Sequence, residues 1–115
     1  MIGMREMAAS LFIGRWQPFH DGHRALVEAV LREGKDVVIA LRDTPINAQN
    51  PLTVDERIHR IREALSDWPW ERIKMVVIPD ISEVCYGRGV GYGIREIRLD
   101  ADTEAISGTK VRASW

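Results

Sequence analysis

Two short segments, far apart in the chain, concentrate residue types that bind phosphate. The first reads GRWQPFHDGH, from Gly14 to His23, and holds two histidines three positions apart with Gly22 between them. The second reads ISGTKVR, from Ile106 to Arg112. Imidazole N–H groups, hydroxyls, backbone N–H groups and a guanidinium can hold phosphoryl oxygens while charge develops on them. The two segments therefore point to a site for a phosphorylated ligand.

The first segment lies where a strand ends and a helix begins. The apolar run SLFIG predicts a buried strand, and DGHRALVEAVLREG repeats apolar residues at helical spacing after Asp21, which can cap the helix. A helix N-terminus offers free N–H groups and a positive dipole end, both of which favour phosphate. His20 and His23 would flank this point, and Gly22 would let a ligand approach the backbone.

The rest of the chain alternates between strands and helices. Residues 36–41 and 73–79 are apolar runs rich in β-branched side chains that predict buried strands. Between them, residues 53–65 predict a helix that begins with a capping box of Thr53 and Glu56. After the third strand, EVCYG and GIREIRLD predict two shorter strands, and Ser107 is a candidate cap for a last helical turn.

This order predicts a single α/β domain over residues 10–115, preceded by a loose leader at residues 1–9. The domain would be a small Rossmann-like parallel sheet of about five strands with right-handed crossovers, flanked by helices. In such sheets ligands bind outside the carboxyl ends of the strands, which is where the histidine turn would lie.

Composition restricts the class of protein. The chain has 115 residues, 45% of them hydrophobic and 29% charged, as in a soluble globular domain. A net charge of −1 argues against a general nucleic-acid binder. The single cysteine, Cys85, excludes an internal disulfide and a cysteine-based zinc site, and we expect it to be buried. No apolar run could span a bilayer and no signal-peptide core is present, so we expect no membrane partner and a cytoplasmic setting.

The histidine turn carries the H-x-G-H signature and resembles the nucleotidyltransferase superfamily. More of the chain, in GRWQPFHDGH, NPLTVDERI and VVIPDI, is similar to archaeal-type nicotinamide-nucleotide adenylyltransferases, which commonly have Phe in place of Trp16. ISGTKVR resembles the I-S-x-T-x-h-R motif that holds the triphosphate in this group. The resemblance covers most of the chain in matching order. It implies a fold similar to the catalytic domain of class I aminoacyl-tRNA synthetases.

The resemblance also implies a mechanism. An acceptor phosphate would attack the α-phosphorus of ATP in line and pyrophosphate would leave, with Mg²⁺ bound mainly by the triphosphate and water. His20, His23 and Arg112 would be the catalytic residues, and Trp16 would stack on a base or a nicotinamide ring. The nucleotide-binding positions in or beside the two motifs would be Gly14, Arg15, Trp16, Phe19, Gly22, Ser107, Gly108 and Thr109.

Three further groups of residues have less specific interpretations. The glycines of GRGVGYG do not follow G-x-G-x-x-G, so this segment predicts a loop lining the base or acceptor pocket, with Arg88 either contacting phosphate or solvated. Arg42, Asp43 and Asn47 follow the second strand and either help to hold the acceptor or form a plain surface loop. Arg57 is interpreted as an exposed, salt-bridged arginine of the second helix.

The chain departs from the adenylyltransferase pattern after the third predicted strand. Members of this group are longer there, whereas this chain ends at Trp115, so the acceptor-binding parts would be shortened or replaced. A homo-oligomer would cover the face left open, or the chain is a shortened domain.

Three functions remain open. The first is an ATP-dependent adenylyltransferase acting on nicotinamide mononucleotide or another small phosphate ester. The second is a cytidylyltransferase that makes a CDP-activated alcohol, although that group typically opens with GTFD where this chain has GRWQPF, which favours ATP. The third is a non-catalytic nucleotide-binding regulatory module. A class I synthetase fragment is disfavoured because the sequence has no K-M-S-K-S-like segment.

Overall fold

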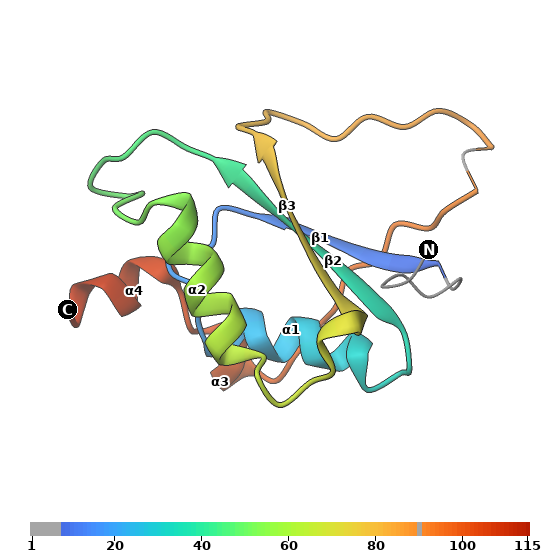
Figure 1. Ribbon diagram of the computed structural model, residues 1–115, viewed down its shortest axis with the longest axis horizontal. Helices are drawn as coiled ribbons and strands as arrows, with labels where there is room; N and C mark the ends of the chain where they lie inside the picture. The colour runs from blue at the N-terminus through green and yellow to red at the C-terminus, as the bar shows by residue number, and fades with distance from the viewer. Residues whose placement is uncertain (1–7, 90) are drawn as a thin grey trace.

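The computed structural model describes residues 8–89 and 91–115, and its centre is a parallel sheet (Figure 1). The strands lie side by side in chain order: β1 (Ala9–Gly14), β2 (Asp36–Asp43) and β3 (Ile73–Pro79). Leu41 of β2 is in register with Gly14 on one side and Val77 on the other. The carboxyl ends of the strands therefore share one edge of the sheet, as the sequence predicts.

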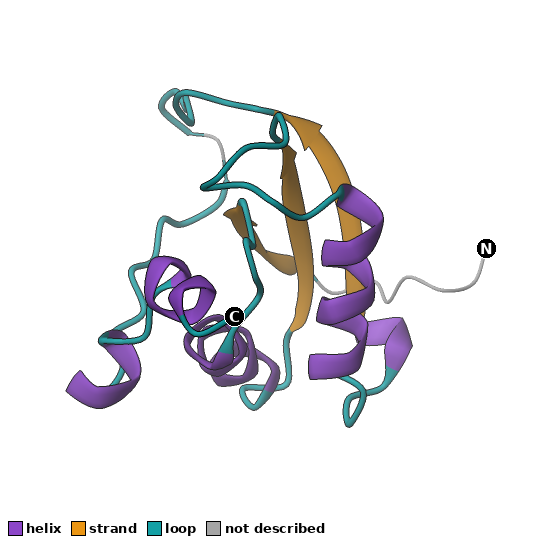
Figure 2. Ribbon diagram, turned by 90° about the vertical axis from the view of Figure 1, so that its left-hand side faces the viewer, coloured by secondary structure: helices purple, strands orange, loops and turns teal. Residues whose placement is uncertain are grey.

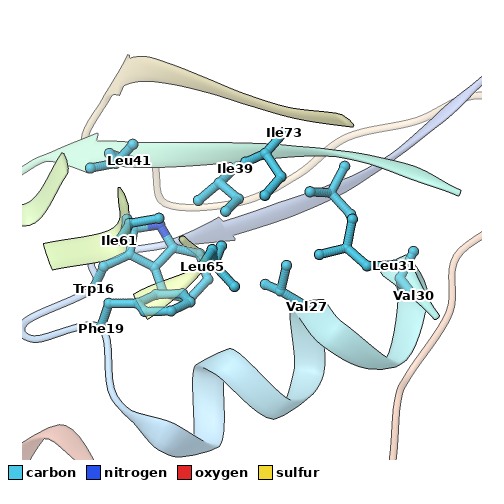
Figure 3. Close-up of a cluster of buried hydrophobic side chains, with 11 residues drawn as sticks. Trp16, Phe19, Val27, Val30, Leu31, Ile39, Leu41, Ile61, Leu65 and Ile73 are labelled. Atoms are coloured by element: carbon cyan, nitrogen blue, oxygen red, sulfur yellow. The ribbon is translucent and has the colours of Figure 1, made fainter. Parts of the chain in front are cut away.

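Helices follow the strands and cover one face of the sheet. The helical segments are α1 (Asp21–Leu31), α2 (Val54–Ala64), the 3₁₀ helix η1 (Trp70–Arg72), α3 (Ala101–Glu104) and α4 (Gly108–Ala113). The two βαβ crossovers run in the same direction across the sheet, so right-handed connections place α1 and α2 on the same face. Side chains from both helices and the strands point toward one another there (Figure 3). These core residues are Trp16, Phe19, Val27, Val30, Leu31, Val37, Ile39, Leu41, Ile61, Leu65 and Ile73.

The helix caps predicted at Thr53 and Ser107 are confirmed. The Thr53 Oγ1 atom accepts a hydrogen bond from the Glu56 N–H at 3.1 Å, and the Glu56 carboxylate accepts one from the Thr53 N–H at 3.0 Å. The Ser107 hydroxyl accepts from the Lys110 N–H at 3.2 Å and begins α4. These short polar side chains satisfy backbone donors that have no partner inside their helix.

The prediction of five strands is wrong: the described residues form a sheet of three. EVCYG and GIREIRLD belong to a long loop between β3 and α3, drawn without any strand in Figure 2. Only residues 80–82 separate the end of β3 from EVCYG, whereas a parallel strand needs a crossover of about a dozen residues or more. Without a crossover helix, this segment cannot return to the start of the sheet as another parallel strand.

Two ion pairs hold the end of this loop against the helices. The guanidinium of Arg95 donates to both carboxylate oxygens of Glu33, just after α1, and the shorter of its two distances is 2.5 Å. Arg98 makes a similar paired contact with Glu104 of α3, at 2.8 and 2.7 Å. These contacts bring the half-buried segment around Ile97 to the side of α1.

Three further expectations concern the ends of the domain and its surface. Of the expected leader, residues 1–7 lie outside the described residues, and β1 begins at Ala9, one residue before the predicted start. Cys85 is exposed, so the expectation of a buried thiol is wrong, because it lies on the long loop and not on a core strand. Across residues 8–89 and 91–115, no helix has the length and apolar character needed to cross a membrane.

Candidate functional site

The histidine turn begins α1 with an unusual cap. His20, and not Asp21, is the N-cap residue, so that prediction is wrong. Its Nδ1 atom accepts hydrogen bonds from the N–H groups of Gly22 at 3.1 Å and His23 at 3.4 Å. The His23 Nδ1 atom accepts from the His20 N–H at 3.3 Å, and the two rings stack with centroids 3.7 Å apart. Two imidazoles thus perform the reciprocal bonding that Ser or Thr and Glu perform in a common capping box.

This arrangement sets the protonation state of both rings. A neutral imidazole that accepts a hydrogen bond at Nδ1 carries its proton on Nε2. Burial lowers the pKa of His20, against a smaller opposing effect of the Asp21 charge. Burial, and then the neighbouring His20, lower the pKa of His23 to about 4, while a hydrogen bond with the Pro18 backbone opposes this. Both rings are therefore neutral N–H donors at pH 7, and positive charge at this site must come from arginines.

The lowered pKa of His23 makes stability depend on pH. Between pH 6.5, the ordinary value, and about pH 4, the unfolded chain binds a proton at this ring that the folded chain does not. We therefore expect the free energy of unfolding to fall as the pH falls through this window. Urea denaturation across the window, compared with His23→Asn, measures the effect. If the free energy of unfolding changed equally with pH in the two proteins, the pKa of His23 would not be lowered in the folded chain.

Trp16 and Phe19 do not lie where a nucleotide base could stack on them. Their exposed fractions are 5% and 7%, and both belong to the hydrophobic core (Figure 3). The Trp16 Nε1 atom donates to the carbonyl of Ala40 in β2 at 3.0 Å, and its ring meets the edge of His23 with centroids 4.8 Å apart. The stacking role predicted for Trp16 is therefore wrong: the turn folds both rings inward, where Trp16 supports His23.

Gly14 is required by the packing of Trp16. A Cβ atom at Gly14 would lie 2.8 Å from the Trp16 ring. We expect Gly14→Ala to lower the free energy of unfolding by about 1–3 kcal/mol, because the buried indole must move to relieve the overlap. Gly87→Ala is the matched control, since an added Cβ there meets no atom within 4 Å. Equal urea midpoints for the two variants would contradict this packing argument.

The second motif contacts the histidine turn directly. The Arg112 Nη1 atom donates to the carbonyl of Gln17, a residue 95 positions away, and Nη2 donates to the Thr109 hydroxyl at 3.3 Å. A Cβ atom at Gly108 would lie 3.2 Å from the same Gln17 carbonyl. Gly22 has a similar role on the other side, since its Cβ would lie 3.4 Å from the Thr103 carbonyl of α3. Both glycines let the C-terminal segment approach the turn.

Two adjoining cavities lie between these segments and share His23, Leu26 and Gly108 in their walls. The first cavity, of about 350 Å³, is lined by His20, Gly22, His23, Leu26, Ile97, Leu99, Thr103, Glu104, Ile106, Ser107 and Gly108. The second cavity, of about 310 Å³, is lined by Phe12, Ile13, Gly14, Arg15, Trp16, Gln17, Pro18, His23, Leu26, Gly108 and Arg112. Both cavities therefore have apolar residues in their walls, and the second also has two arginines, Arg15 and Arg112.

Glu104 places a carboxylate in the wall of the first cavity, and this carboxylate is paired with the guanidinium of Arg98. The paired hydrogen bonds from Arg98, together with the Leu99 N–H, lower the pKa of Glu104 to about 2. The carboxylate is therefore ionised and bound to a guanidinium. No three His, Cys, Asp or Glu side chains come together as a metal site within residues 8–89 and 91–115.

Arg88 does not reach this site. It lies on the exposed glycine-rich loop and lines a separate hollow with Tyr86 and Tyr92. The structure therefore does not bring Arg88 together with the histidines, and of the two interpretations left open it favours a solvated arginine.

The residues expected to hold an acceptor also lie away from both cavities. Arg42 forms an ion pair with Asp80 at 2.7 Å and joins the ends of β2 and β3. Asn47 accepts hydrogen bonds from its own loop, including the Asn50 N–H at 2.9 Å, and Asp43 is exposed. These contacts fit a surface loop that binds itself and the neighbouring strand, and a role in holding the acceptor stays a prediction.

Two buried residues that support the turn were missed by sequence reasoning. Gln17 is 4% exposed, and its side-chain amide bonds the backbone of Leu52 in both directions, at 3.0 and 2.9 Å. Arg57 is 1% exposed, so its interpretation as a surface arginine is wrong. Position 57 lies four residues before Ile61 on the apolar stripe of α2, and that spacing is the signal that could have placed it inside.

The sheet and the turn after β1 together define a Rossmann-like α/β domain with a ligand side at the carboxyl ends of its strands. A family model described as cytidylyltransferase-like matches residues 11–80. The chain belongs to this cytidylyltransferase-like family. The matched residues include the histidine turn and end before the segment from Ile106 to Arg112.

Relatives with named activities support this assignment. The chain is 37% identical over 75 residues to the nicotinamide-nucleotide adenylyltransferase of Caldivirga maquilingensis. It is 40% identical over 72 residues to the enzyme of the same name from Ignicoccus hospitalis. The two alignments cover 64% and 61% of this chain and 42% of each relative, so the chain spans less than half the length of these curated relatives.

A solved structure confirms the fold. The bifunctional NMN adenylyltransferase/ADP ribose pyrophosphatase from Francisella tularensis superposes with a TM-score of 0.57 at 31% identity. The superposition covers 63% of this chain and 22% of that one. A second structure of the Francisella protein, complexed with AMP and a Mn ion, matches with the same values.

Proposed function

We propose that this protein is a nucleotidyltransferase that transfers AMP from ATP to a small phosphate-bearing acceptor, with nicotinamide mononucleotide as the first candidate. The observation that carries the proposal is the contact between the two phosphate-binding motifs, made by Arg112 and Gln17 beside two cavities that share His23. The names of the relatives support the choice of ATP and of a nicotinamide nucleotide.

The two arginines of the second cavity distinguish it from the first, because both cavities have apolar residues in their walls. The first cavity, with Leu26, Ile97 and Leu99 in its walls, suits the nucleoside part of ATP. The second cavity, with Arg15 and Arg112, suits anionic phosphate groups. His23 lies in the wall of both and would donate a hydrogen bond to the phosphoryl group in transfer. Positioning and charge stabilisation would then be the protein's contribution, with no covalent intermediate.

A metal ion fits this site only as part of a metal–nucleotide complex. The carboxylate in the first cavity, Glu104, is already bound by Arg98, so the cavity walls offer no free pair of carboxylates. Mg²⁺ would be held mainly by triphosphate oxygens and water, where it neutralises charge on the leaving pyrophosphate. Ser107, next to the Gly108 that both cavities share, and Thr109, which accepts a hydrogen bond from Arg112, would be hydroxyl contacts for the β- and γ-phosphates.

The proposal includes the setting of the reaction. We place the protein in the cytoplasm, with small-molecule partners and without nucleic acid or a membrane. The outer edge of β1, which carries an exposed Leu11, is unpaired among the described strands. A homo-oligomer would protect such an edge.

Pyrophosphate release tests the proposal. The full chain is incubated with Mg²⁺, with ATP or CTP, and with a panel of acceptors that includes nicotinamide mononucleotide. Release that requires both ATP and a phosphate-bearing acceptor is the expected result. Release with CTP but not with ATP would instead support the cytidylyltransferase function. If the protein bound nucleotide but released no pyrophosphate with any acceptor, the result would instead support a non-catalytic nucleotide-binding module.

A further inference from the structure

Arg57 is a charged side chain in the interior of the domain. It is the largest of the side chains that are less than 2% exposed, and it lies between α2 and the ends of the strands. Burial lowers the pKa of its guanidinium, while the charge of Asp43 opposes that effect. Placing a cation in the interior is costly unless its donors are satisfied, so the contacts of this group need an explanation.

Its donors bind backbone carbonyls from three elements. The Nη1 atom donates to the carbonyl of Arg15 at 2.8 Å and to that of Arg42 at 2.7 Å. The Nε atom donates to the carbonyl of Thr53 at 3.3 Å. Arg15 is the first residue after β1, Arg42 is near the end of β2, and Thr53 is the N-cap of α2. One side chain therefore joins the start of the histidine turn to its neighbouring strand and helix.

We infer that Arg57 is a positioning residue: it holds the backbone at Arg15 and thereby sets where the histidine turn places His23. The link from Arg15 to His23 is short. Trp16 follows directly, has a positive φ of 56°, and packs its ring against His23. A left-handed backbone at a bulky residue persists only where surrounding contacts enforce it. The catalytic consequence of this inference rests on the proposed function, whereas the geometric part does not.

The contacts at position 57 require the planar guanidinium group of arginine. Its Nη1 and Nε groups are fixed in one plane and reach carbonyls on separate elements, whereas a lysine has a single ammonium on a flexible stem. Lysine would keep the charge and part of the bonding, and methionine would keep only an apolar stem without charge or donors. The two substitutions therefore give graded losses if the hydrogen bonds position the turn.

The test compares Arg57→Lys, Arg57→Met and a control, Arg62→Met, on the exposed side of the same helix. The first readout is the titration of His23, followed by NMR of the imidazole protons in the full chain. We expect its pKa to rise from about 4 toward 6.5 in the order control, Lys, Met, as the ring loses its packed environment. The second readout is kcat for pyrophosphate release, expected to fall by about a hundredfold in Arg57→Met and less in Arg57→Lys. Far-ultraviolet circular dichroism selects a temperature at which each variant is folded.

The outcomes separate this inference from the proposed function. A raised His23 pKa in a protein without transferase activity would support the positioning role and reject the enzyme. An unchanged His23 titration in folded Arg57→Lys and Arg57→Met would overturn the positioning role, whatever the activity. Failure of both variants to fold at any temperature would also overturn it, in favour of a role in overall stability.

Discussion

His23→Ala is expected to lower kcat for pyrophosphate release by at least about a hundredfold, because removing one preorganised donor from a site of developing charge has effects of this size. His23 lines both cavities, is the only imidazole that they share, stacks on His20 and contacts Trp16. Rates at saturating ATP and acceptor, measured from pyrophosphate release, report the effect. The loss should appear mainly in kcat if the ring acts in the transition state.

Two further variants test whether a loss of kcat in His23→Ala comes from the missing Nε2 donor. His23→Asn keeps an oxygen that can accept the His20 N–H but lacks an Nε2 donor, so it should be folded and nearly as slow. His59→Ala removes an exposed histidine that pairs with Glu63 on α2 and should leave kcat unchanged. His23→Ala also removes the acceptor of the His20 N–H, which is the reciprocal half of the capping box, so its fold is verified by urea denaturation. A rate within about threefold of the unaltered protein would reject His23 as a catalytic residue.

Arg112→Met is expected to reduce kcat/KM by about a hundredfold or more, since it removes both the charge that we propose to bind phosphate and the hydrogen bond that joins the two motifs. The structure places its Nη1 on the Gln17 carbonyl and its Nη2 on the Thr109 hydroxyl. Arg112→Lys keeps the charge and loses the two-point geometry, so an intermediate rate is expected. Comparing kcat/KM of Arg112→Met with that of Arg112→Lys shows how much of the loss comes from the missing charge and how much from the missing geometry.

Lys110→Met is the matched control for Arg112. Lys110 lies on the same short helix, is exposed, and contacts the Ala105 carbonyl at 3.3 Å. If the effect of Arg112 depends on its specific contacts and not on the total positive charge of α4, removing the Lys110 charge should change kcat/KM by no more than about threefold. Equal losses in the two variants would contradict the direct contact proposed for Arg112.

Local signals in the sequence predicted the first two-thirds of the fold. Apolar runs, helical spacing and the Thr53 cap depend on residues within one turn or one strand of each other, so one chain is enough to recognise them. Ser107 was predicted as a cap for the same reason, and the structure confirms both caps. The alternation of strands and helices then left a parallel sheet as the simplest arrangement.

The long loop after β3 shows where this reasoning stops. EVCYG and GIREIRLD have the composition of strands, but a strand also needs a neighbouring edge within reach. The short connection after Pro79 gives the chain no crossover, and the loop is held instead by contacts such as that between Arg95 and Glu33. Arg88, on this loop, was therefore assigned to a site that it does not reach.

The sequence by itself determined the two motifs proposed to bind phosphate, which contain His20, His23 and Arg112, and the place of the histidine turn at the carboxyl end of the first strand. Only the tertiary structure decided which of the residues in and around the turn are exposed and which are buried inside it. Trp16 and Arg57 have side chains that suit a binding site or a surface, and both are buried as supports of the turn. Burial is decided by what packs against a residue from distant parts of the chain, and no local pattern records it in full.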